Sequence, residues 1–264
     1  MKIKELPHLR SKISSQYHVV DPALASQIDE MALWWITEDM CTLAAGAAES
    51  LPEWSPTQAM PTPSGFMWID GESPAVKSII TSEVAPIRAI GWTYNHDKDS
   101  ITAVTWYEEG SELTEGLMFV FQASQIMTRR SKFEKMTPLP TRDGDEFAAV
   151  QFLGSIWLLS QQPGVAEEKT VNKSSRRNRS SGGKTQSPSA VRVINVRGGG
   201  HAGGHASDST GGSGERHLSV RFMVRGHWRQ QACGPKHGQR KPLFIQPFMK
   251  GPDDAPVRPT VRKL

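Results

Sequence analysis

The stretch from Ile87 to Tyr107 reads IRAIGWTYNHDKDSITAVTWY and sets the expected fold. Two runs within it, Ile87 to Tyr94 and Ile101 to Tyr107, are rich in the β-branched and aromatic residues that are typical of strands. The residues between them, Asn95 to Ser100, have the Asn, Asp and Ser content of a turn. The stretch therefore predicts an antiparallel hairpin.

Neighbouring segments extend the hairpin into a meander and flank it with helices. The runs Phe66 to Ile69 and Leu117 to Phe121 also resemble strands. Asp21 is a suitable N-cap, and the proline after it suits the first position of a helix. Apolar residues at three- to four-residue steps then predict a helix over Pro22 to Ala48, with a break near Thr37 as the alternative, and another helix over Asp145 to Gln161. Helix, antiparallel meander and helix define an α+β fold.

Charge divides the chain into two parts. Residues 1–165 hold 12 Lys and Arg against 21 Asp and Glu, a net charge of −9, and we assign them to an acidic α+β domain. Residues 166–264 hold 19 against 6, a net charge of +13. So basic a segment is typical of a protein that binds a polyanion such as nucleic acid. The alternative is that the basic part docks on the acidic domain of the same chain.

The basic part subdivides by composition. Residues 166–190 contain almost no large apolar side chain, which predicts a disordered basic linker. Residues 191–264 hold three strand-like runs, and we assign them to a small basic β module with an internal glycine-rich loop at 198–215. A module with so thin a core is expected to pack on the first domain or to extend its sheet.

Composition also excludes several classes of protein. The two cysteines, Cys41 and Cys233, are too few for a disulfide framework or a tetrathiolate zinc site and favour a reducing interior. No secretory signal is visible at the N-terminus, and no apolar run approaches the roughly 18 residues that cross a bilayer. We therefore expect a cytoplasmic protein with no membrane partner. The sequence indicates no cofactor and no metal site.

The segment from His217 to Arg229, HLSVRFMVRGHWR, alternates with a period of two. Apolar residues fall mostly on even positions, and Arg, His and Ser fall on odd positions. In a regular strand the basic groups from Arg221 to Arg229 would share one face over about 26 Å. A row of that length suits a phosphate backbone, because arginine is a planar fork that matches phosphate.

Further basic residues follow this segment beyond a Gly-Pro turn, from which they can fold back toward it. We predict that nucleic acid contacts Arg221, Arg225, His227, Arg229, Arg240 and Lys241. Gly226 qualifies the geometry, since glycine in a strand often marks a bulge that changes which side chains share a face. The alternative is an ordinary solvent face whose charges keep a strand edge from pairing with other chains.

Two histidines allow a catalytic alternative. His227 and His237 lie on either side of the turn and could serve as acid and base in metal-independent RNA cleavage, with nearby cations stabilising the charged transition state. No sequence pattern fixes their geometry, and a strong orienting carboxylate is missing. Whether the protein is an enzyme stays open, and the binding role is favoured.

The residues from Val224 to Gln230, with Arg240 to Ile245 and Lys250 to Asp253, resemble the C-terminal signature of uncharacterised proteins from phages, plasmids and integrated elements of high-GC Gram-positive bacteria. Val191 to Ile194 matches the same pattern. More remotely, the box from Arg225 to Arg229 is similar to the Arg-Gly-His-x-Arg box of a phage anti-CRISPR family that silences synthesis of a type V-A effector. The resemblance implies a mobile-element accessory protein that works on RNA or a ribonucleoprotein.

The combined prediction is a mobile-element accessory protein that binds nucleic acid, with RNA favoured, through its basic C-terminal β module. One alternative is a ribonuclease that uses His227 and His237. The other is a protein-interaction or anti-defence factor that binds no nucleic acid, in which the acidic N-terminal domain has a protein partner.

Overall fold

The computed structural model describes residues 1–77, 84–110, 112–122, 125–130, 134–139, 144–171, 190–197, 221–252 and 255–256. The chain divides into two compact units, Met1–Val196 (unit 1) and Arg197–Leu264 (unit 2). Most of the predicted linker and the whole predicted glycine-rich loop lie outside the described residues. Unit 1 is built of helices and a large, mainly antiparallel sheet, so the predicted α+β fold class is confirmed.

The described residues of unit 1 form a ten-stranded sheet in the order β8-β7-β6-β5-β4-β2-β1-β10-β9, with β3 paired to β4. The predicted meander is its antiparallel part, and β1 is parallel to both of its neighbours, β2 and β10. The strands are β1 Ala32–Ile36, β2 Ser64–Ile69, β3 Ala75–Lys77, β4 Val84–Asn95, β5 Ser100–Glu109, β6 Glu112–Phe121, β7 Ile126–Arg129, β8 Thr137–Pro138, β9 Ala166–Val171 and β10 Val191–Val196.

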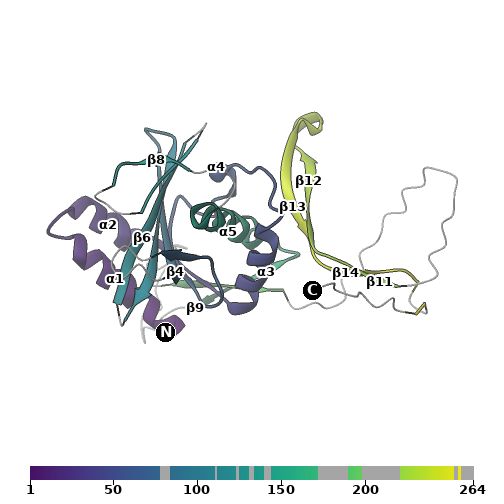
Figure 1. The fold of residues 1–264 in the computed structure, drawn as a ribbon, viewed down its shortest axis with the longest axis horizontal. Coiled ribbons are helices and arrows are strands. Elements are labelled where there is room, and N and C mark those ends of the chain that lie inside the picture. Colours follow the sequence, from purple (N-terminus) through teal and green to yellow (C-terminus); the bar gives the residue numbers. More distant parts are fainter. Residues whose placement is uncertain are drawn as a thin grey trace, which may run out of the picture. The chain divides into compact units, whose positions relative to one another are not determined.

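Helices cover both faces of this sheet, which gives unit 1 three layers (Figure 1). α1 (Leu6–Tyr17) and α2 (Pro22–Glu30) lie on one face, and α3 (Glu38–Ala48) and α5 (Asp145–Ser160) pack together on the other. The short elements are η1 (Ile3–Glu5) and α4 (Pro56–Ala59).

The predicted helix over Pro22–Ala48 is wrong in its middle, where the chain forms β1. Asp21 caps α2 as expected, since its Oδ1 accepts from the backbone N–H of Leu24 at 3.0 Å. The next residues, ALWWI, are almost continuously buried because α1 and α2 cover one face of β1 and α3 covers the other. A strand that is buried on both faces has a continuous apolar sequence. When helical segments flank such a sequence, its residues also fit the three- to four-residue spacing of a helix.

The boundary between the units also differs from the predicted one. β9 comes from the predicted linker and β10 from the predicted β module, yet both complete the sheet of unit 1. Leu33 of β1 lies opposite Val191 of β10, and both are fully buried. Apolar burial next to β1 therefore holds β10 in the first unit, and the division falls after Val196.

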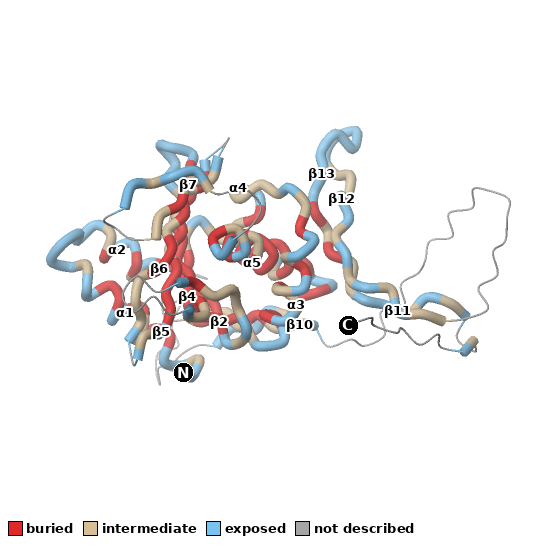
Figure 2. The backbone as a smooth tube through the Cα atoms, in the orientation of Figure 1, coloured by how far each residue is buried: buried red, intermediate tan, exposed pale blue. Residues whose placement is uncertain are grey.

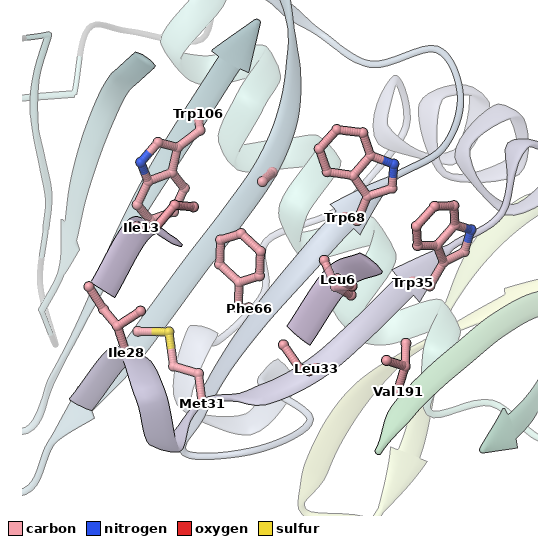
Figure 3. Packing of buried hydrophobic residues seen from close by; sticks show 11 residues of the cluster. Leu6, Ile13, Ile28, Met31, Leu33, Trp35, Phe66, Trp68, Trp106 and Val191 are labelled. Atoms are coloured by element: carbon pink, nitrogen blue, oxygen red, sulfur yellow. The ribbon is translucent and has the colours of Figure 1, made fainter. Parts of the chain in front are cut away.

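The central strands and α5 are largely buried (Figure 2), and the buried side chains are mostly large aromatic and aliphatic ones. On the α5 face, Trp92 and Trp157 are in edge-to-face contact at 5.3 Å, and Trp54 packs on Trp157 at 6.1 Å. α5 is buried nearly all round, as expected for a helix between a sheet and other helices. On the opposite face, Figure 3 shows Phe66 beside Trp106 and Leu6 above Leu33.

Unit 2 consists of two short antiparallel ribbons in the residues that the structure describes. β11 (Phe222–Val224) pairs with β14 (Phe248–Lys250), and β12 (His227–Cys233) pairs with β13 (Gln239–Ile245) through a turn that holds η2 (Pro235–His237). The predicted strand therefore breaks after Val224 instead of running on to Arg229.

Gly226 lies at this break, in agreement with the expectation that a glycine within a strand marks an irregularity. A Cβ atom there would stand 2.6 Å from Cζ of Phe244 and 3.1 Å from Cδ of Pro247. Only glycine lets the backbone approach these rings so closely. Pro247 lies in the matching gap between β13 and β14 and cannot donate a ladder hydrogen bond, so both sides of the ribbon are interrupted.

Candidate nucleic-acid interface

The β12–β13 hairpin sorts its side chains onto two faces, because directly opposed residues of an antiparallel pair project to the same side. Arg229 lies opposite Leu243, and Gln231 lies opposite Lys241. Counting in steps of two along each strand, one face therefore carries His227, Arg229 and Lys241. We call these three residues and Gln231 the cationic face. The structure brings three of the six predicted contact residues to this face.

Arg229 and Lys241 are exposed, and a hydrogen bond orients the first of them. Nη2 of Arg229 donates to Oε1 of Gln231, two residues along the same strand, at 2.5 Å. Gln231 was not predicted from sequence, although extending the odd-numbered series by one step would have found it. Lys241 lies opposite Gln231, so it is a diagonal neighbour of Arg229 on the same face.

Arg240 is separated from this group, which corrects the prediction that it folds back beyond the turn to join His227 and Arg229. Arg240 lies opposite Ala232, on the face that also carries Trp228 and Phe244. The two rings are in edge-to-face contact at 5.2 Å, and Phe244 is buried. Adjacent residues of a strand point to opposite sides, so Arg240 and Lys241 cannot share a face. Trp228 is half-buried, as its even position in the alternation predicts.

Arg221 and Arg225 lie outside the hairpin. Arg225 is exposed in the break before Gly226, and its carbonyl accepts a hydrogen bond from Nδ1 of His227 at 3.1 Å. Arg221 is half-buried, and its backbone N–H donates to the carbonyl of Pro256 at 2.9 Å. Arg225 therefore adjoins the cationic face through His227, whereas Arg221 belongs to the β11 end of the ribbon.

The two candidate catalytic histidines lie at opposite ends of the hairpin. His227 begins β12 and lies opposite the last residue of β13, whereas His237 is in the turn that joins the strands. The six residue steps from His227 to the end of β12 alone span about 20 Å. One phosphodiester cannot reach both imidazoles, so the geometry that the ribonuclease alternative needs is absent from this hairpin.

The charge of this region is one-sided. Residues 221–252 include Arg221, Arg225, Arg229, Lys236, Arg240, Lys241 and Lys250, and the segment contains no Asp or Glu. Arg225, Arg229, Arg240 and Lys241 make no ion pair with any residue that the structure describes. Lys236 and His237, at the hairpin tip, are exposed and have positive φ angles of 53° and 55°. The hairpin therefore presents cations that acids of its own segment do not neutralise.

Two other types of site are absent from the described residues. No three His, Cys, Asp or Glu side chains gather there as a metal site would require. No helix in the same part of the chain is long and apolar enough to cross a membrane.

Comparisons with known proteins give little further information. No protein-family model matches the chain, and no curated protein matches it. Among solved structures it is similar to the crystal structure of AcrVA2, with 12% sequence identity and a TM-score of 0.32, over 95% of this chain and 85% of that chain. A likeness this weak carries no inference about function.

Proposed function

We propose that the protein binds nucleic acid through the cationic face of the β12–β13 hairpin and the adjoining Arg225. The observation that carries the proposal is the coincidence of register and charge. His227, Arg229 and Lys241 share one face of a hairpin that lies in a segment with seven Lys and Arg and no Asp or Glu. Exposed cations that share one face of a paired ribbon match the repeated charge of a phosphate backbone.

Single-stranded RNA is the ligand that we favour. The ribbon offers only a few phosphate contacts, and the half-buried Trp228 lies on the opposite face from Arg229. Backbone contacts of this kind position a strand without reading its bases. We therefore expect binding with little sequence preference and strong salt dependence. For four phosphate contacts on a single strand, the slope of log K against log salt concentration is roughly −3.

The test compares the two faces of the hairpin. Labelled single-stranded RNA is titrated with the full chain and with Arg229→Ala plus Lys241→Ala, and binding is followed by fluorescence anisotropy over a series of salt concentrations. The double variant is expected to bind more weakly at every salt concentration, with a slope that is shallower by about 1.4. Adding Arg225→Ala is expected to abolish retention of the RNA without lowering the melting temperature.

Arg240→Ala is the matched control, because it removes an exposed cation from the other face of the same hairpin. Its effect should be smaller than that of either residue on the cationic face. Equal binding by the double variant and the unchanged chain would reject the proposal. Single-stranded DNA of the same sequence, as a competitor, tests the preference for RNA.

The broader setting that we propose, an accessory protein of a mobile element, is supported by the resemblance of the box from Arg225 to Arg229. This box forms the break and the first half of β12, so the resembling residues coincide with the proposed interface. If the Arg229→Ala plus Lys241→Ala variant keeps its function intact, this result would favour a protein-interaction or anti-defence role without nucleic acid.

A further inference from the structure

The second ribbon of unit 2 places exposed apolar side chains next to the cationic hairpin. β11 and β14 continue the two strands of the β12–β13 hairpin, beyond the break at Gly226 and Pro247 (Figure 1). Three residue steps of about 3.3 Å join Val224 of β11 to His227 of the cationic face, so the two are at most about 10 Å apart. A strand of nucleic acid that lies on the hairpin can therefore extend onto this ribbon.

The register of β11 and β14 defines the faces of the ribbon. Val224 lies opposite Phe248, and Phe222 lies opposite Lys250. Opposed residues of an antiparallel pair project to the same side, and so do residues two steps apart along one strand. These four side chains therefore share one face, which we call the aromatic face.

Phe248 is the most accessible ring of the aromatic face. It is 44% exposed, whereas Phe222 is half-buried. Among the residues that the structure describes, the ring of Phe248 contacts no other ring and no cation. Removing exposed apolar surface from water is favourable, so a flat ligand that covers this ring gains affinity.

The surroundings of Phe248 are basic. Lys250 is exposed on the same face, two residues along β14, and Arg225 is exposed directly after Val224. Residues 221–252 contain seven Lys and Arg and no Asp or Glu, so the charge of this segment attracts anions and repels cations. An aromatic ring beside cations is the combination that binds single-stranded nucleic acid, because bases stack on the ring while the cations contact the phosphates.

We propose that the aromatic face binds unpaired bases of the same strand whose phosphates contact the cationic face. This inference rests on the proposed function and deepens it, since it assigns the ligand to single-stranded nucleic acids with accessible bases. Bases within a duplex stack on one another, so Phe248 has a partner only in an unstacked base. Every base has a flat face, so stacking adds affinity with little sequence preference.

The experiment separates stacking from ion pairing by the salt dependence of binding. Labelled single-stranded RNA is titrated with the full chain and with Phe248→Ala, and fluorescence anisotropy is followed over a series of salt concentrations. Phosphate contacts set the slope of log K against log salt concentration, because they release counterions, and stacking releases none. Phe248→Ala is expected to bind roughly 5- to 150-fold more weakly at every salt concentration, with an unchanged slope.

A strand without bases provides the second test. A ribose-phosphate strand of the same length that carries no bases keeps the phosphates and loses the stacking partners. The unchanged chain should bind this strand more weakly than RNA, by at least the factor that Phe248→Ala loses. Phe248→Ala and the unchanged chain should bind the strand without bases equally well. Equal affinity of the unchanged chain for the two strands would overturn the proposal.

Variants of the same ribbon serve as controls. Met223 is 53% exposed and lies opposite Met249 on the other face of the ribbon, so Met223→Ala should leave the affinity for RNA unchanged. Phe248→Trp should keep the affinity, and Phe248→Leu should lose it because leucine has no ring. An unchanged salt slope shows that the cationic face stays intact in each variant. Normal binding by Phe248→Leu would indicate an apolar contact of the kind that an acidic peptide also makes, and it would overturn the proposal.

The two proposals fail in different ways. If Phe248→Ala binds like the unchanged chain while Arg229→Ala plus Lys241→Ala binds more weakly, the stacking proposal is wrong and the cationic face stands. If Phe248→Ala binds more weakly while the double variant keeps its affinity and its slope, the cationic face is wrong and the aromatic face stands.

Discussion

The two units use strands in opposite ways. Unit 1 buries its strands between helical layers, and seven of the eight tryptophans lie in it. Among the described residues of unit 2, the buried apolar side chains are Pro242 and Phe244. Apolar burial is the main favourable term in folding, so unit 1 has a core to stabilise it. The hairpin of unit 2 depends more on backbone pairing and one aromatic contact, and its side chains remain accessible to a ligand.

The cysteines give the largest expected contrast between the units. Cys41 is fully buried, and burial raises its pKa to about 12, whereas Cys233 is half-buried at the end of β12. The thiolate is the reactive form, so a thiol reagent at pH 8 should label Cys233 in the native protein. Cys41 should react orders of magnitude more slowly, at the rate at which unit 1 opens.

Labelling is measured by absorbance with Ellman's reagent and located by mass spectrometry. Cys233→Ser is the control and should leave a native protein with almost no reactive thiol. Equal labelling rates for Cys41 and Cys233 would contradict the buried position of α3.

The next contrast concerns one tryptophan in each unit. Trp157 is fully buried and contacts Trp54, Trp92 and Phe121, so Trp157→Ala should lower the free energy of unfolding by about 3–5 kcal/mol. Trp228 contacts Phe244 in the hairpin, and Trp228→Ala should leave the main unfolding transition unchanged. Urea denaturation followed by far-UV circular dichroism measures both. A comparable loss in the two variants would show that the hairpin contributes to the core of unit 1.

The smallest contrast uses three glycines. A Cβ atom at Gly65 of β2 would lie 2.4 Å from the Trp92 ring, so Gly65→Ala should cost about 1–3 kcal/mol of unfolding free energy. Gly46 has open space around it within α3, and Gly46→Ala should stabilise by about 0.5–1 kcal/mol. Gly226→Ala should disturb the hairpin and leave the denaturation midpoint of unit 1 unchanged. A destabilised Gly46→Ala variant would mean that α3 packs differently.

Much of unit 1 could be predicted from the sequence because its signals are local. The hairpin from Ile87 to Tyr107 and the helix from Asp145 follow from composition, turn residues and apolar spacing. β1 could not be separated from its flanking helices, since a strand buried on both faces loses the alternation that identifies it. The place of β10 beside β1 depends on a pairing across more than 150 residues, which no local pattern records.

For the candidate site, alternation predicted the exposure of Arg225, His227 and Arg229 correctly, and it placed Trp228 on the inner face. Strand alternation separates Arg240 from Lys241, but which of the two shares a face with Arg229 depends on the hairpin register, which is set by the turn from Gly234 to Gly238. Sequence alone did not fix that register. The aromatic face escaped prediction altogether, because it depends on the pairing of Val224 with Phe248, which no local pattern records.

The central position of β10 bears on how the protein is made. Until Val196 has left the ribosome, β1 has no partner on one side, and its tryptophan-rich backbone edge is open to other chains. Such an edge is a template for aggregation. The first unit is thus topologically incomplete through most of its synthesis, and a chain cut after Val165 should be insoluble even though it holds all the helices of that unit.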